Sequence, residues 1–167
     1  MNNNINTDNM LRVGTVLHGT YRIDRYLSSG GFGKTYVATN IQFGEQYAIK
    51  EFFMRGISQR DNNNTTVSVS NTDNRETFAS QLEKFKKEAR RLRKLNNEHI
   101  VRVHDLFEEN GTAYYVMDYI DGENLSDRLK RTGKPLSEAE DMQLLPQVLD
   151  ALEAAHKAVS DTQLTLP

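Results

Sequence analysis

The sequence predicts an α+β fold in which a five-stranded antiparallel sheet and one long helix are followed by two or three further helices. Branched and aromatic side chains gather in short runs of strand length, and glycine-containing turns separate consecutive runs. Residues 78–95 repeat apolar side chains at steps of three and four, and the pattern after residue 121 is again helical. The sheet is therefore expected to form first in the chain, with most of the helices after it.

The amino-acid composition argues against several kinds of partner and site. The chain has 167 residues, of which 37% are hydrophobic and 26% are charged, as in ordinary globular proteins. A formal net charge of -2 gives no basic field, which argues against nucleic acid or an anionic membrane as the main partner. Cysteine is absent and the four histidines are scattered, so no metal site is predicted. With no signal peptide and no apolar stretch of roughly 18 residues, we expect a cytoplasmic protein without a membrane segment.

Five segments are expected to be strands. They are residues 21–29, 34–39, 45–52, 100–107 and 112–119. A Glu-Asn-Gly turn at 109–111 joins the last two and is typical of a hairpin. Residues 1–20 are expected to be a partly disordered lead-in, in which an apolar segment at 11–17 packs on the body. Residues 55–77 are polar and rich in asparagine, and either a small exposed hairpin or a flexible loop fits them equally well.

The clearest helical pattern covers residues 78–95. Its apolar stripe consists of Leu82, Phe85, Ala89, Leu92 and Leu95, and lysines and arginines fill most of the other faces. A short helix is expected over residues 124–130. Ser137 and Glu140 form a capping box that opens a long helix toward residue 158, and Pro146 inside that helix is expected to kink it.

The most informative chemistry lies in the glycine-rich turn Gly30-Gly31-Phe32-Gly33. Such a turn lets the backbone close over phosphate oxygens, because glycine tolerates unusual dihedral angles and has no side chain in the way. Lys50 lies at the end of a strand with apolar neighbours, where an ammonium is costly unless a carboxylate and an anion meet it. Glu88 is the carboxylate best placed to do so, and Glu83 is a second candidate on periodicity alone.

Five motifs of the chain, taken in order, resemble the small lobe of a protein kinase. They are residues 27–36, Ala48-Ile49-Lys50, the helix with Glu88, residues 95–101 and residues 116–122. The resemblance is to the bacterial serine/threonine kinases of eukaryotic type, and it covers roughly residues 21–158. It implies a small lobe over 21–120 with an insertion at 55–77, a hinge and first large-lobe helices over 121–158, and a non-matching tail over 159–167.

The resemblance also implies how ATP phosphates would be bound. Lys50 would bind the α- and β-phosphates and pair with Glu88. The segment that would cover the nucleotide consists of Leu27, Ser28, Ser29, Gly30, Gly31, Phe32, Gly33 and Thr35. In this segment Ser28 replaces the first glycine of the family pattern, and Thr35 replaces the valine that normally covers adenine.

On the adenine side, the resemblance implies contacts from three further segments. Ala48 would touch the ring, and Met117 would guard the back pocket. Backbone groups of Asp118 and Ile120 would meet the adenine edge, and Asn124 would lie near the ribose.

The resemblance stops before the segments that carry out phosphoryl transfer. A kinase needs a catalytic-loop aspartate and an asparagine and aspartate that hold magnesium. After Ala158 the family continues into His-Arg-Asp, whereas this sequence reads Val-Ser-Asp-Thr, so Asp161 receives no catalytic role. We therefore expect a truncated or fragmentary chain that is inactive alone, with Mg²⁺ required by the intact kinase and the protein substrate left open.

Two other classes of function compete with an ATP-binding portion of a serine/threonine kinase. One is a non-catalytic nucleotide- or partner-binding module, in which the exposed stripe of the last helix docks another protein. The other is a Rossmann dinucleotide enzyme. It is excluded because both flanks of the turn are strand-like, the first glycine is missing and no βαβ unit follows.

Overall fold

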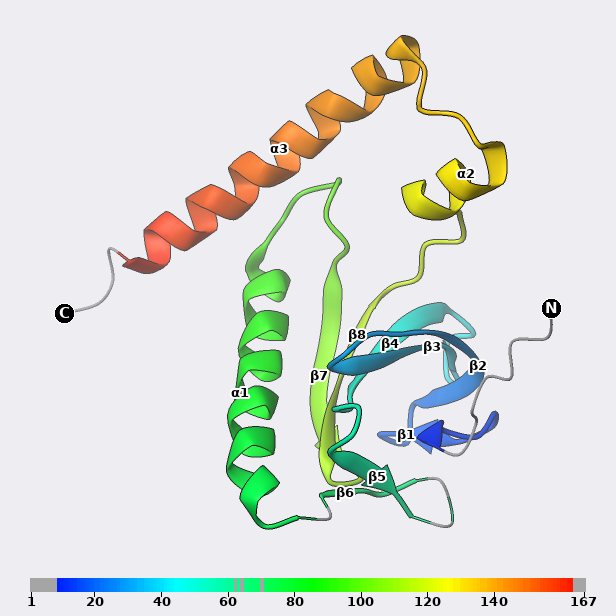
Figure 1. The fold of residues 1–167 in the computed structure, drawn as a ribbon, viewed down its shortest axis with the longest axis vertical. Coiled ribbons are helices and arrows are strands. Elements are labelled where there is room, and N and C mark those ends of the chain that lie inside the picture. Colours follow the sequence, from blue (N-terminus) through cyan, green and yellow to red (C-terminus); the bar gives the residue numbers. More distant parts are fainter. Residues whose placement is uncertain (1–8, 62, 64, 70, 164–167) are drawn as a thin grey trace. The chain divides into compact units, whose positions relative to one another are not determined.

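The computed structural model describes residues 9–61, 63, 65–69 and 71–163, with side chains up to residue 158 (Figure 1). The chain divides into two compact units. The first contains the residues up to Arg91 together with Val103–Tyr119, and the second contains Leu92–Arg102 and the residues from Ile120 onward. The first eight residues of the predicted lead-in at 1–20 and the last four of the predicted tail at 159–167 lie outside the described residues.

The first unit is built on an antiparallel sheet of order β1-β2-β3-β4-β8-β7 (Figure 1). Its strands are β1 (Val16–Leu17), β2 (Tyr21–Ser29), β3 (Gly33–Asn40), β4 (Gln46–Phe52), β7 (Val103–Glu109) and β8 (Thr112–Asp118). The five predicted strands are confirmed. Strand β1 was not predicted as a strand, although the apolar segment that contains it packs on the body as expected, with Leu11 and Leu17 buried.

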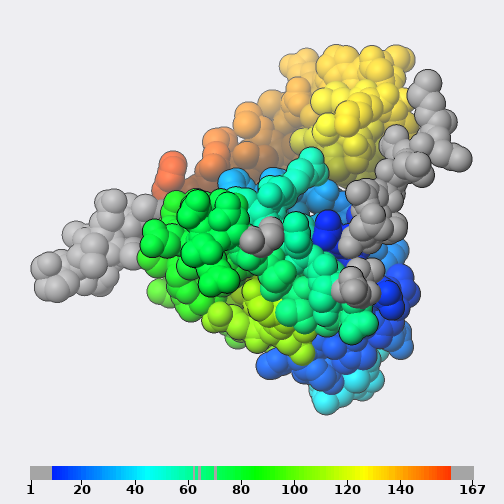
Figure 2. Space-filling model, turned by 60° about the horizontal axis from the view of Figure 1, so that its bottom comes forward, coloured from blue at the N-terminus to red at the C-terminus, as the bar shows by residue number. Residues whose placement is uncertain are grey.

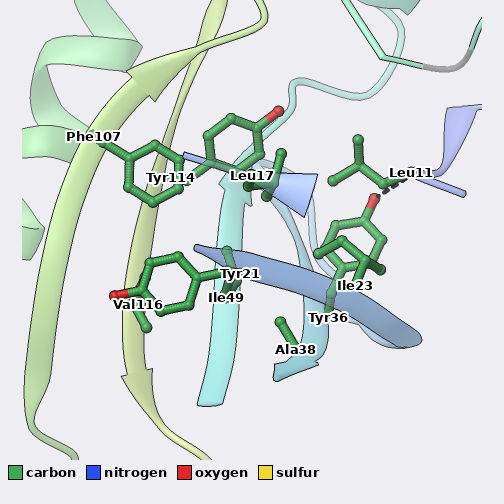
Figure 3. Close-up of a cluster of buried hydrophobic side chains, with 10 residues drawn as sticks. All are labelled: Leu11, Leu17, Tyr21, Ile23, Tyr36, Ala38, Ile49, Phe107, Tyr114 and Val116. Atoms are coloured by element: carbon green, nitrogen blue, oxygen red, sulfur yellow. Dashed lines mark hydrogen bonds between the residues drawn. The ribbon is translucent and has the colours of Figure 1, made fainter. Parts of the chain in front are cut away.

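One face of this sheet carries the hydrophobic core. Side chains alternate between the two faces of a strand, so every second position of β2, β3 and β4 points into the core. The core cluster consists of Leu11, Leu17, Tyr21, Ile23, Tyr36, Ala38, Ile49, Phe107, Tyr114 and Val116 (Figure 3). Lys50 precedes Glu51 in β4, and the two side chains therefore leave the strand on opposite faces.

Helix α1 (Asp73–Lys94) buries Phe85 and Ala89 of its predicted apolar stripe. The Phe85 ring lies 5.5 Å from that of Phe52 and 5.0 Å from that of Tyr115. The helix begins five residues before the predicted start at residue 78, so that prediction was wrong for its first turn and a half. The early turn is polar and has no apolar period, but the Asn71 side chain accepts a hydrogen bond from the Asp73 N–H at 3.1 Å.

The asparagine-rich insertion is a hairpin of β5 (Ser58–Arg60) and β6 (Val67–Val69). Of the two interpretations left open, the hairpin is the one observed. It is only partly exposed, because Ser58 and Val67 are buried whereas Gln59 and Ser68 are exposed. The hairpin region lies between α1 and the N-terminal strands (Figure 2).

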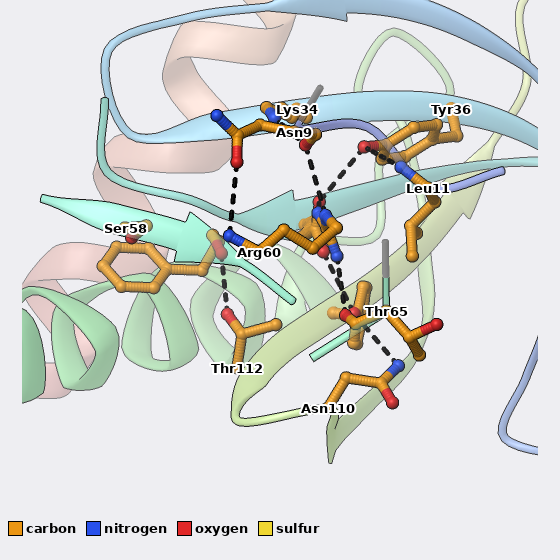
Figure 4. Close-up of polar contacts among 12 residues, drawn as sticks. Asn9, Leu11, Lys34, Tyr36, Ser58, Arg60, Thr65, Asn110 and Thr112 are labelled. Atoms are coloured by element: carbon orange, nitrogen blue, oxygen red, sulfur yellow. Dashed lines mark hydrogen bonds and ion pairs between the residues drawn. The ribbon is translucent and has the colours of Figure 1, made fainter. Parts of the chain in front are cut away.

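A buried ion pair fastens the hairpin to the sheet. The Arg60 Nη2 atom lies 2.6 Å from the Glu51 carboxylate, and both side chains are 0% exposed. Arg60 also donates to the carbonyl oxygens of Thr65 at 2.7 Å and Asn9 at 3.2 Å (Figure 4). The guanidinium is thus surrounded by acceptors, which is the condition under which a buried charge is tolerated.

The second unit contains α2 (Leu125–Thr132) and α3 (Glu138–Gln163). The predicted capping box is confirmed: the Glu140 N–H donates to Ser137 Oγ at 3.3 Å, and the Ser137 N–H donates to Glu140 Oε2 at 2.9 Å. Helix α3 ends at Gln163, five residues beyond the region 121–158 that resembles the family. None of the described helices is both long and apolar enough to cross a membrane.

The buried ion pair gives the first testable prediction. Arg60→Ala leaves the Glu51 carboxylate buried without its counter-ion, so we expect the free energy of unfolding to fall by about 3–5 kcal/mol. Urea unfolding followed by circular dichroism measures this loss.

The matched control is Arg22→Ala, which breaks an ion pair at 3.4 Å whose arginine side chain is 50% exposed. Exposed pairs contribute little, and a change below about 1 kcal/mol is expected. Equal losses in the two variants would show that Arg60 does not stabilise the fold through its buried charge.

Candidate nucleotide-binding site

The glycine-rich turn connects β2 to β3 and is held down at its base. The Gly30 N–H donates to the Gly33 carbonyl at 2.9 Å, which closes the turn. The chain after β4 adds two further hydrogen bonds, from the Phe53 N–H to the Phe32 carbonyl and from the Arg55 N–H to the Gly31 carbonyl, each at 3.3 Å. The Phe32 side chain is 59% exposed. The backbone of the turn is therefore anchored while its tip faces outward.

Strands β3 and β4 come so close together at Gly33 that a side chain does not fit there. A Cβ atom at this position would lie 2.9 Å from the Glu51 carbonyl oxygen and 3.5 Å from Lys50 Cε. Real Cβ atoms do not come this close to a backbone oxygen, so any side chain would push β3 away from β4. Gly30 and Gly31, in contrast, have open space where a Cβ would be.

Lys50 lies beside this turn and meets Glu88 of α1. Its Nζ atom is 3.3 Å from Glu88 Oε1, and the Tyr115 hydroxyl donates to the same oxygen at 3.3 Å. The sequence left Glu83 as a second candidate, but Glu83 pairs with Lys86 at 2.5 Å. The expected Lys50–Glu88 pair is thus present in the structure.

The charge on Lys50 is stabilised although the side chain is half-buried. Burial lowers the pKa of Lys50, but the Tyr115 hydroxyl and the Glu88 carboxylate outweigh it, so the pKa is raised above its ordinary value. The ammonium is consequently charged at neutral pH. The Lys50 side chain remains 32% exposed, which leaves part of the ammonium able to meet an anion.

Three other residues predicted for the site share the sheet face of Lys50. Thr35 is the cross-strand partner of Lys50, and Met117 is that of Ala48. Antiparallel partners point to the same face, so these side chains form one surface next to the Lys50–Glu88 pair. Asp118, at the end of β8, has an oxygen 2.5 Å from His104 Nε2.

The remaining predicted residues have different surroundings. Leu27, Ser28 and Ser29 end β2 and are exposed. Ile120 and Asn124 belong to the second unit, where Ile120 is exposed. The Asn124 side chain caps α2 by accepting from the Asp127 N–H at 2.9 Å, and its proximity to a ribose stays a prediction.

Sequence reasoning missed Tyr115. Its hydroxyl reaches Glu88 and its ring lies 5.4 Å from Lys50 Nζ, so it supports both members of the pair. The signal available in the sequence was its place in the strand after the hairpin turn, where every second residue faces the same way as Lys50.

Comparisons with known proteins agree with this geometry. The sequence model of the protein kinase domain matches residues 21–159. The chain belongs to the protein kinase family.

Among curated relatives, the serine/threonine-protein kinase PknA of Mycobacterium tuberculosis (strain ATCC 25618 / H37Rv) is 35% identical over 152 residues, which cover 88% of this chain and 31% of PknA. The probable serine/threonine-protein kinase YbdM of Bacillus subtilis (strain 168) is 28% identical, over 89% of this chain and 51% of YbdM. The chain thus spans about a third to a half of the length of these relatives.

Solved structures agree on the fold. The structure described as the PpkA-294 apo form has a TM-score of 0.74 and 27% identity, and the match covers 78% of this chain and 46% of that one. The kinase domain of M. tuberculosis PknI has a TM-score of 0.64 at 23% identity, over 88% of this chain and 51% of that one. The mixed fold of a curled antiparallel sheet with helices is therefore that of protein kinase domains.

The close approach at Gly33 gives a second prediction. Gly33→Ala is expected to lower the free energy of unfolding by about 1–3 kcal/mol, because the new Cβ forces the strands apart. Thermal unfolding measured by circular dichroism would report it as a lower Tm. Gly31→Ala, with nothing within 4 Å of its new Cβ, is the control and should leave the Tm close to that of the parent. Unchanged Tm in Gly33→Ala would refute the steric role.

Proposed function

We propose that this chain is the ATP-binding portion of a protein serine/threonine kinase, which transfers the γ-phosphate of ATP to protein hydroxyl groups. The observation that carries the proposal is the Lys50–Glu88 pair, at 3.3 Å, directly beside the anchored glycine-rich turn. A charged, partly exposed lysine next to a turn without side chains suits a phosphate chain. Membership of the protein kinase family supports the same assignment.

In this proposal different residues of the first unit bind different parts of the nucleotide. Lys50 binds the α- and β-phosphates and is kept in place by Glu88 and Tyr115. Gly30 to Gly33 cover the phosphates, with Phe32 at the tip of the turn. Residues Leu27, Thr35, Ala48 and Met117 line the adenine side, and the backbone of Asp118 offers groups to the adenine edge. Ile120 and Asn124 belong to the second unit, and their contacts with the nucleotide stay predictions from the family resemblance.

The chemistry of transfer would come from ATP, whose γ-phosphoryl group is the one passed to the substrate. The contribution of this chain is electrostatic: the Lys50 ammonium offsets phosphate charge, and Glu88 and Tyr115 hold it in one position before the nucleotide arrives. Among the described residues no group of three acidic, histidine or cysteine side chains could hold a metal ion, and we assign no Mg²⁺ ligand to them.

A non-catalytic partner-binding module is the alternative, and one observation favours it. Helix α3 carries a row of exposed apolar side chains, namely Met142, Leu145, Val148, Leu149 and Leu152. The two functions differ in their need for Lys50, since only nucleotide binding uses it.

The third prediction tests by titration calorimetry whether nucleotide binding requires Lys50. The parent chain is expected to bind MgATP or ADP weakly. Lys50→Met removes a charged donor to phosphate, which is worth about 1.5–3 kcal/mol, so the Kd should rise by at least about tenfold. Lys87→Met, on the exposed face of α1, is the control and should bind as the parent does.

A second pair of variants separates Glu88 from Glu83, the other candidate on α1. Glu88→Gln should weaken nucleotide binding by roughly fivefold, corresponding to about 1 kcal/mol for a partly exposed pair, whereas Glu83→Gln should not. The absence of binding heat in the parent, or undiminished binding by Lys50→Met, would refute the proposed site.

A further inference from the structure

A hollow lies on the sheet face opposite Lys50. Its volume is about 480 Å³, and its lining includes Tyr26, Ser29, Gly30, Lys34, Phe53 and Arg55. In the β3–β4 register Thr35 pairs with Lys50 and Lys34 pairs with Glu51. Because successive side chains of a strand point to opposite faces, Lys34 in the hollow and Lys50 in the proposed nucleotide site lie on opposite faces of the sheet, although Ser29 and Gly30 border both.

The charges on this face do not balance. Glu51 is the cross-strand neighbour of Lys34, but its carboxylate pairs with Arg60 at 2.6 Å. Among the described residues no carboxylate lies within 4.0 Å of Lys34 Nζ, although Lys34 is only 8% exposed. One buried carboxylate, that of Glu51, therefore lies near two cations. It forms its ion pair with Arg60 and not with Lys34.

The partners of Lys34 are a carbonyl oxygen and an aromatic ring, which stabilise an ammonium less than a carboxylate does. Its ammonium donates to the carbonyl oxygen of Asn9 and lies 3.7 Å from the centre of the Phe53 ring. Burial lowers the pKa of Lys34 to about 8; Glu51 opposes this, and the charges of Arg60 and Arg55 add to it. The lysine is still mostly protonated at neutral pH, so the hollow keeps a positive charge that is only partly satisfied.

A second cation lines the same hollow. Arg55 is exposed and, among the described residues, has no carboxylate within 4.0 Å. Its backbone N–H is used by the Gly31 carbonyl, but its side chain is available to a ligand. Two cations beside the hydroxyl of Ser29 form a site for an anion with several acceptor oxygens. The rings of Tyr26 and Phe53 supply apolar lining, and the volume exceeds that of a bare anion.

We propose that this hollow binds a small ligand that carries a phosphate group and an apolar ring, with Lys34 and Arg55 holding the phosphate. The ligand would supply the negative charge that Glu51 cannot share. The site and the proposed nucleotide site share Ser29 and Gly30 at their border but use different cations, which are Lys34 and Arg55 here and Lys50 there, so each can be tested without the other.

Phenyl phosphate is a probe of this chemistry, and the full chain is titrated with it by calorimetry. Binding in the millimolar range or tighter is expected. Inorganic phosphate should bind more weakly because it lacks the ring, and benzyl alcohol should not bind because it lacks the charge. Lys34→Met should weaken phenyl phosphate binding at least about tenfold, as expected for a charge-assisted contact. Lys50→Met should leave it unchanged.

Arg55→Met is the second variant, at an exposed position where folding is not at risk, and it should also weaken binding. Circular dichroism verifies that Lys34→Met is folded; if it is not, Arg55→Met alone decides. No binding by the parent overturns the proposal. Loss of binding in Lys50→Met with retention in Arg55→Met also overturns it, since phenyl phosphate would then occupy the nucleotide site. Equal affinity for inorganic phosphate would overturn the role of the ring.

Discussion

The Glu51 carboxylate is the group on which the arrangement of the first unit depends. It is fully buried and accepts hydrogen bonds from Arg60 at 2.6 Å, from Tyr36 at 3.2 Å and from Tyr114 at 3.0 Å. These three partners belong to β5, β3 and β8, so a single carboxylate ties the hairpin to three strands of the sheet, including its own. Burial, followed by the nearby Glu51 charge, raises the pKa of both tyrosines, which keeps them protonated as donors.

Lys50 and Glu51 are neighbours in the sequence, but one forms a partly exposed ion pair and the other a buried one. The Glu51–Arg60 pair is sealed from water, so removal of either partner leaves an isolated buried charge. The Lys50–Glu88 pair is partly exposed, with side chains 32% and 51% exposed, and such pairs contribute little to stability. A weak pair is the one suited to a ligand, because an arriving anion can share the lysine without breaking the fold.

Much of the fold could be predicted from the sequence because its apolar periods are regular. Alternation predicted five strands, and the three- and four-residue steps placed Glu88 near the apolar face of its helix, where it meets Lys50. Two of the failures, at Arg60 and Lys86, share one physical cause, which is that polar residues are assumed to lie outside. Arg60 in the insertion is buried by an ion pair that pattern reasoning cannot see. Lys86 was expected on the basic outer face of the helix, but it is 8% exposed and contacts Glu83 and Glu108.

The glycine-rich turn is also held by the segment that Glu51 anchors. The Glu51 carbonyl oxygen is the atom that a side chain at Gly33 would strike, so the position of this strand sets how closely β3 can approach. The next residues of the same segment, Phe53 and Arg55, donate to the carbonyls of Phe32 and Gly31. The Glu51 side chain holds the end of β4 from the core side. The base of the turn is therefore held in position, while its tip stays exposed. The buried carboxylate and the backbone groups that anchor the turn therefore belong to one short segment, residues 51–55.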